Sequence, residues 1–218
     1  MLYELLVIPA ALIALVLHEV SHGYAAYKLG DPTARIMGRL SLNPLKHLDP
    51  IGAICMVLFR FGWAKPVPID TRFFKNPKRD MALTALAGPV ANLLIAFFSL
   101  PFYILAVNAY NTALFSGAAP IVMTLLNIAV YFFSALHGVN LGLALFNLLP
   151  IPPLDGSRVL FTFLPTQYYF RIMRYERYIS LALMLLLLCG VKLGFLSALS
   201  SAVTDAMLRV WLLIPIFR

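Results

Sequence analysis

The chain has 218 residues, of which 61% are hydrophobic and 12% are charged, and its mean hydropathy is +0.87. Soluble domains average about 25% charged residues, so this composition excludes an ordinary soluble protein and indicates a chain that folds in a bilayer. The net charge of +8 does not indicate nucleic-acid binding, because no aromatic and basic motif accompanies it.

Apolar segments alternate with polar loops along the chain, and a helix needs about 20 apolar residues to cross a bilayer. The sequence predicts five spans, at about residues 2–29, 81–109, 119–149, 178–191 and 195–214. The break from Gly190 to Gly194 makes the last two a tight helical hairpin. We therefore expect an all-α polytopic membrane protein that forms a single domain over residues 1–218, without an internal repeat.

The loop between the first two spans, residues 30–80, is rich in Pro, Gly and charge. Within it, residues 51–61 form an apolar run that is too short to span a bilayer. Because proline interrupts helices, four prolines argue against one long helix here: Pro44, Pro50, Pro66 and Pro68. We expect a re-entrant or interfacial piece, with short strands or a hairpin at the membrane edge.

Basic residues concentrate in two loops. Ten of the seventeen Lys and Arg fall in residues 28–79, and four more fall in residues 158–177. Five spans place both loops on one side of the membrane, which the positive-inside rule identifies as the cytoplasm. The N-terminus is then outside, and the C-terminus at Arg218 is inside.

The first span carries the motif HExxH, as His18-Glu19-Val20-Ser21-His22. Residues four apart share a helix face, so both imidazoles can bind one metal ion while Glu19 acts as the general base. Zinc fits this chemistry because it takes nitrogen and oxygen ligands and keeps a position open for water. Ionisable groups inside a span are costly and mark function; the alternative is that they are only solvated at a helix end.

A third ligand is expected from the proline-broken segment at residues 147–156, NLLPIPPLDG, which follows the third span. Asp155 is its carboxylate, and a carboxylate with two His is a known catalytic zinc set. The alternative, an even choice on this segment alone, is that Asp155 only caps the helix that begins near Gly156.

These motifs together resemble the site-2 proteases, intramembrane zinc metalloproteases of peptidase family M50. The matching segments are HEVSH at 18–22 and NLLPIPPLDG at 147–156, with further similarity in NPLKHLDPIG at 43–52, GWAKPVPID at 62–70 and AGPVAN at 87–92. The chain is similar to the compact group that lacks a PDZ domain. That form favours a prokaryotic plasma membrane as its location.

The resemblance implies one Zn²⁺ ion held by His18, His22 and Asp155, in a core of three transmembrane helices. It also implies substrates that are transmembrane segments of other proteins, often trimmed first by another protease. The active site is then expected within the membrane, near its cytoplasmic face.

Further candidates are polar residues that surround these motifs. Asn147 and Asn92 could bind the substrate backbone or the oxyanion, or could form interhelical hydrogen bonds; the resemblance favours a catalytic role for Asn147. Trp63 and Lys65 could hold extended substrate at a strand edge spanning residues 62–69, or Trp63 could anchor the chain at the interface. His47 and His137 are expected to be structural, tied by hydrogen bonds.

The sequence therefore predicts a zinc-dependent endopeptidase that cuts peptide bonds in or near transmembrane segments. Two alternatives belong to other classes of protein. A metal or ion transporter would be expected to have two repeated halves in its sequence. An inactive membrane scaffold is the second alternative, and the intact Glu19 argues against it. The oligomeric state does not follow from the sequence.

Overall fold

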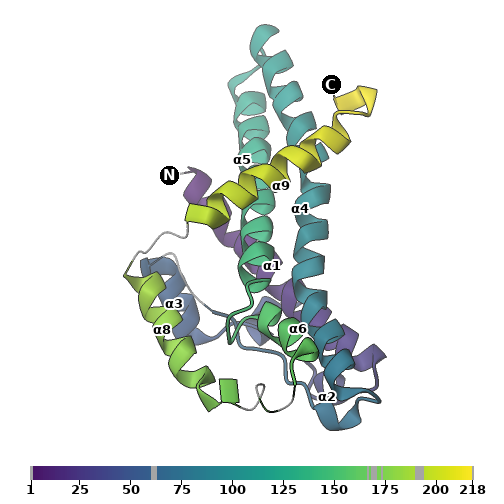
Figure 1. Cartoon of the computed structure of the whole chain (residues 1–218). Coiled ribbons are helices and arrows are strands. Elements are labelled where there is room, and N and C mark those ends of the chain that lie inside the picture. Colours follow the sequence, from purple (N-terminus) through teal and green to yellow (C-terminus); the bar gives the residue numbers. More distant parts are fainter. Residues whose placement is uncertain are drawn as a thin grey trace. The chain divides into compact units, whose positions relative to one another are not determined.

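The computed structural model describes residues 2–59, 63–165, 167, 171–172, 174–189 and 194–217. These residues fold into helices joined by irregular loops (Figure 1). The elements, in chain order, are α1 (Leu2–Lys28), α2 (Thr33–Ile36), η1 (Pro44–Lys46), α3 (Pro50–Phe59), η2 (Thr71–Phe73), α4 (Pro77–Phe115), α5 (Pro120–Asn147), α6 (Asp155–Phe163), α8 (Glu176–Leu188), α9 (Gly194–Trp211) and η3 (Pro215–Phe217).

Three of the described helices, α1, α4 and α5, are long and apolar enough to cross a membrane. They correspond to the first three predicted spans, and they make the chain an integral membrane protein. The predicted total of five spans is not confirmed: α8 has 13 residues, and the 18 residues of α9 include Asp205 and Arg209. Residues 190–193 of the predicted hairpin break, and Arg218, lie outside the described residues.

The prediction of strands in the 30–80 loop is wrong for the residues that the structure describes. They contain only an isolated antiparallel bridge between Leu48 and Ala64, and the apolar run forms the short helix α3. Its start explains the difference. The Asp49 carboxylate accepts the Gly52 N–H at 2.9 Å, and Pro50 occupies the first helical position, where a missing N–H costs nothing.

The described contacts divide the chain into two compact units. Unit 1 combines residues 1–14, 92–143 and 195–218, and unit 2 combines residues 15–91 and 144–194. Each of the three long helices contributes residues to both units. The single domain over residues 1–218 stays a prediction.

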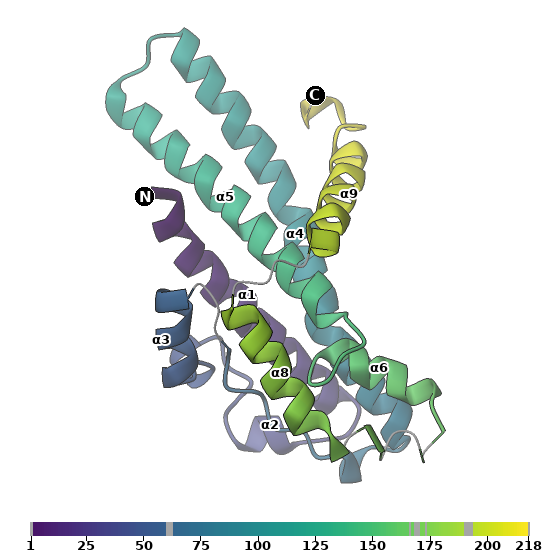
Figure 2. The same cartoon turned by 60° about the vertical axis from the view of Figure 1, so that its left-hand side comes forward.

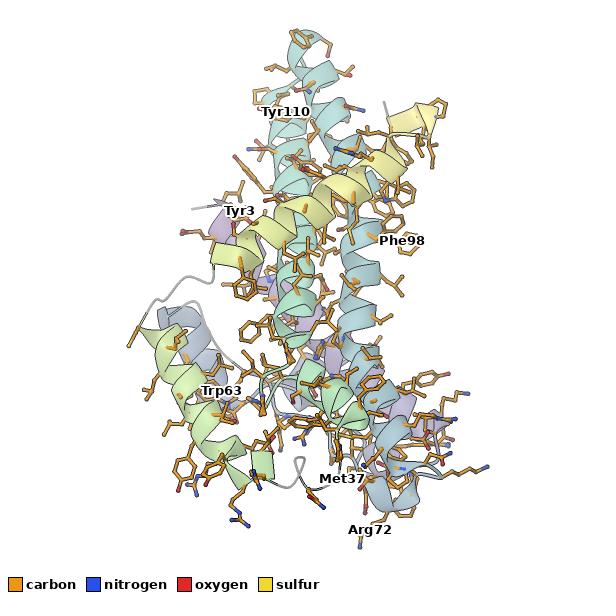
Figure 3. The ribbon with its side chains drawn as sticks, in the orientation of Figure 1. Tyr3, Met37, Trp63, Arg72, Phe98 and Tyr110 are labelled. Atoms are coloured by element: carbon orange, nitrogen blue, oxygen red, sulfur yellow. The ribbon has the colours of Figure 1, made fainter. Side chains whose placement is uncertain are left out.

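In unit 1, α4 and α5 run antiparallel beside each other, as both views show (Figures 1 and 2). Ala96 on α4 and Ala135 on α5 are fully buried, and such small side chains allow membrane helices to approach closely. Phe98 instead points outward from α4 (Figure 3) and is 54% exposed. An apolar side chain on the outside is expected where lipid replaces water as the solvent.

Candidate metal centre and active site

The two histidines of HExxH lie one turn apart on the same face of α1. Both are buried, with 5% of His18 and 7% of His22 exposed. Their Nε2 atoms are 3.0 Å apart. The predicted sharing of a helix face is confirmed, and the Nε2 atoms of the two histidines point toward each other.

Asp155, the first residue of α6, completes this group. Its Oδ2 atom lies 3.2 Å from His18 Nε2 and 3.3 Å from His22 Nε2. The broken segment after α5 thus brings the carboxylate back to α1, as predicted. The three side chains form a group that could hold a metal ion.

The ring orientation of His22 is set by Thr84 on α4, whose role the sequence did not reveal. The His22 Nδ1–H donates to the Thr84 carbonyl at 2.8 Å. A neutral imidazole with a proton on Nδ1 keeps its lone pair on Nε2. The hydrogen bond therefore leaves the atom that faces His18 and Asp155 ready to bind a cation, an arrangement common to histidine ligands.

The distances among these atoms fit zinc. A tetrahedral zinc ion with bonds of about 2.0–2.1 Å keeps its ligand atoms roughly 3.3 Å apart, close to the 3.0–3.3 Å seen here. Asp155 Oδ2 is also buried without a hydrogen-bond partner in the described part of the chain. A buried carboxylate oxygen without a donor is costly, and a cation at this point would compensate it.

The two imidazoles beside Asp155 favour the ionised form of its carboxyl group. Burial raises the pKa of its carboxyl group, but the imidazoles of His18 and His22 beside it outweigh this effect and lower the pKa to about 2. The group therefore supplies an anionic oxygen at neutral pH, and together with two neutral imidazoles it forms a donor set typical of catalytic zinc.

Gly88 on α4 makes room for the two imidazoles. A Cβ atom at this position would collide with His22 Nε2 and lie 2.6 Å from His22 Cε1 and 2.7 Å from His18 Cε1. Only glycine fits this close approach. The AGPVAN segment signalled similarity at this place, but nothing in the sequence connected Gly88 with the histidines.

Glu19 lies beside the histidines on α1 and is half-buried. Its Oε2 accepts the Val67 N–H at 2.8 Å. In the described residues the other carboxylate oxygen, Oε1, makes no hydrogen bond. One oxygen of the expected base is thus fixed while the other stays available for a proton.

Residues 6–190 match the sequence model of peptidase family M50. The chain belongs to peptidase family M50. It is 38% identical over 213 residues to "Putative zinc metalloprotease YwhC" of Bacillus subtilis, which covers 96% of this chain and 94% of that protein.

More distant relatives are the proteins named "Putative zinc metalloprotease Rip2". The Mycolicibacterium smegmatis protein is 32% identical over 158 residues, 70% of this chain and 54% of its own length. The Mycobacterium tuberculosis protein is 30% identical over 161 residues, 71% of this chain and 56% of its own length. The chain thus spans just over half of each mycobacterial relative. No solved structure matches the chain.

Asn147 and Asn92, the two asparagines predicted to act in this M50 peptidase, take different places in the structure. Asn147 is the half-buried last residue of α5, where the segment leading to Asp155 begins. Asn92 is fully buried in unit 1, and its amide donates to the Ala14 carbonyl at 3.2 Å and to Asn140 Oδ1 at 2.7 Å. Both N–H groups of Asn92 are therefore used between helices, and its substrate-binding role stays a prediction.

The expected strand edge around Trp63 and Lys65 offers little backbone to a substrate. The Lys65 N–H donates to the His47 carbonyl at 2.8 Å, the Val67 N–H donates to Glu19, and Pro66 and Pro68 have no N–H. Residues 65–68 thus have no free donor for an added strand. The half-buried Trp63 and exposed Lys65 side chains remain predicted substrate contacts, and Gly62 lies outside the described residues.

The other two histidines, His47 and His137, form hydrogen bonds within the protein, as expected. His47 is 1% exposed, and its Nε2 lies 2.7 Å from the Ser41 carbonyl. His137 Nδ1 lies 2.9 Å from the Ala96 carbonyl, and its Nε2 lies 2.9 Å from Thr204 Oγ1. Neither belongs to the group formed by His18, His22 and Asp155.

Proposed function

We propose that this chain is a zinc-dependent endopeptidase that hydrolyses peptide bonds in or next to transmembrane segments of other membrane proteins. The observation that carries the proposal is the group formed by His18, His22 and Asp155, with the Glu19 carboxylate beside it on an apolar helix. Membership in family M50 and the names of its relatives support the same activity.

The residues present assign the roles. His18 Nε2, His22 Nε2 and Asp155 Oδ2 would hold a single zinc ion, which supplies Lewis acidity for peptide hydrolysis when bound. Glu19 takes a proton from the attacking water at its free Oε1 and returns it to the leaving amine. Asn147 is the proposed donor that stabilises the oxyanion.

The substrate must be unwound locally, because a helix keeps its peptide groups in internal hydrogen bonds. The concentration of Lys and Arg in residues 28–79 and 158–177 supports a site near the cytoplasmic face of a prokaryotic plasma membrane, with the N-terminus outside. Transmembrane helices of other proteins and the surrounding lipid are then the partners of this enzyme.

The test compares purified wild type with Glu19→Gln. Both are assayed for zinc content and for cleavage of a transmembrane peptide in detergent. We expect equal zinc and a loss of cleavage of about 10²–10⁴-fold in the variant, the range of a general base. Equal cleavage by both would reject the mechanism, and zinc retention without cleavage by wild type would favour a scaffold.

The third ligand is tested with Asp155→Ala. The variant should lose zinc during dialysis against a weak chelator, because removing the carboxylate leaves two ligands. Asp205→Ala, an exposed aspartate on α9, is the matched control and should keep its zinc. Unchanged zinc content in Asp155→Ala would refute the assignment.

A further inference from the structure

A short segment without helix or strand, residues 65–70, is attached to the helix that carries HExxH and to the loop that follows it. We call this segment the strap. Arg39 Nη2 donates to the Lys65 carbonyl at 2.6 Å and to the Pro66 carbonyl at 3.2 Å. At the other end of the strap, the Asp70 N–H donates to Asp31 Oδ2 at 2.7 Å. Between these attachments, the Val67 N–H reaches Glu19.

Arg39 is unusual because its charge is buried without an acidic partner. Only 8% of the residue is exposed, and no carboxylate pairs with it in the described ranges of the chain. The backbone N–H of Arg39 donates to the Ala34 carbonyl at 2.8 Å. Burying a guanidinium is costly unless strong acceptors compensate it. Here the acceptors are two successive carbonyls of the strap.

The sequence of the strap makes the Val67 N–H a specific donor. Its neighbours Pro66 and Pro68 have no N–H and restrict the backbone, so Val67 presents the donor within this stretch. The Val67 side chain also packs over Gly23, where an added Cβ would lie 3.0 Å from Val67 Cγ1. The two carbonyls that Arg39 binds directly precede this N–H along the chain.

We propose that Arg39 is a positioning residue for Glu19. By holding the Lys65 and Pro66 carbonyls, it places the Val67 N–H to bind one Glu19 oxygen, so that the other oxygen is aimed for proton transfer. The inference rests on the proposed function, because it assigns Glu19 as the base. In the described part of the chain, Arg39 makes no hydrogen bond with the three residues of the metal group, so zinc binding should not depend on it.

The test uses three variants in the same detergent assay. Arg39→Met keeps an unbranched side chain but removes every donor. Arg39→Lys keeps a charge and donors for a carbonyl. Arg35→Met, which replaces an exposed arginine on α2, is the matched control. For each variant, kcat, KM, zinc content and thermal stability are measured.

We expect Arg39→Met to lower kcat by about tenfold or more, part of the 10²–10⁴-fold contribution of a general base. KM and zinc content should stay at wild-type values, since the metal ligands remain in place. Arg39→Lys should recover most of the lost kcat, and Arg35→Met should behave as wild type. This pattern separates positioning of the base from a general effect on folding.

Three results would overturn the inference: wild-type kcat in Arg39→Met, a parallel loss of zinc and kcat, or no recovery with Lys. If Arg39→Met does not fold, Val67→Pro decides, because it removes the N–H itself and should show the same fall in kcat alone. If neither variant folds, the strap serves the fold and the positioning role is rejected. Glu19→Gln in the same assay tests the proposed function separately.

Discussion

Gly88→Ala is the most direct test of the zinc centre, because it alters the site without removing any ligand. The added Cβ would lie 2.6 Å from His22 Cε1 and 2.7 Å from His18 Cε1. Since carbon atoms pack at about 3.5–4.0 Å, the rings or α4 must retreat by about 1 Å. Ligand distances in a zinc site tolerate roughly 0.2 Å, so the displacement exceeds the tolerance several-fold.

We expect zinc affinity to fall by at least the roughly 10–100-fold that loss of an outer-shell partner causes. The helix itself should not weaken, because alanine is a better helix former than glycine by about 1 kcal/mol. Zinc affinity is measured by equilibrium with a buffered zinc indicator, and helicity is measured by circular dichroism.

Gly142→Ala on α5 is the matched control, because an added Cβ there meets nothing within 4 Å. It should bind zinc as wild type does. Wild-type affinity in Gly88→Ala, with α4 intact, would show that the imidazoles do not occupy the proposed positions.

Three further substitutions test contacts within the two units. Gly156→Ala should destabilise the protein by about 1–3 kcal/mol and weaken zinc binding, because its Cβ meets the Leu148 carbonyl and lies 2.6 Å from the Leu149 oxygen. Asn92→Leu should cost about 0.6–2 kcal/mol with KM unchanged, because its amide joins helices. His137→Phe should cost about 1–3 kcal/mol with zinc content unchanged, because the Ala96 carbonyl and the Thr204 hydroxyl in unit 1 lose their hydrogen-bond partner.

Each of these three expectations can be contradicted by a specific measurement. Stability is measured by thermal unfolding in detergent, and the kinetic constants by peptide cleavage. Wild-type stability of Gly156→Ala would mean that the start of α6 has room to move. A raised KM with unchanged stability in Asn92→Leu would support substrate binding by that amide. Zinc loss in His137→Phe would place this histidine in the metal centre.

Much of the metal centre follows from the sequence because its information is local. The spacing of His18 and His22 places both on one helix face. Because ionisable side chains are energetically unfavourable in an apolar membrane span, the apolar residues around the two histidines indicate a functional role for them. The choice of Asp155 relied on the resemblance together with the broken backbone before it. The long membrane spans are likewise predicted from local sequence, because the length and the hydropathy of a segment determine whether it can cross a bilayer.

In the 30–80 loop two local signals compete, the prolines that interrupt a helix and the residues that start one. The helix α3 replaced an expected hairpin because Asp49 and Pro50 start a helix more effectively than the nearby prolines interrupt one.

By itself, the sequence determined which residues could bind zinc and that a bilayer is the solvent of the chain. Only the tertiary structure decided what orients those residues: the Thr84 carbonyl on His22, the space left by Gly88, and the Val67 N–H on Glu19. The physical reason is that backbone carbonyls, N–H groups and empty space carry no side-chain signature. Their position is known only when the segments that supply them have packed.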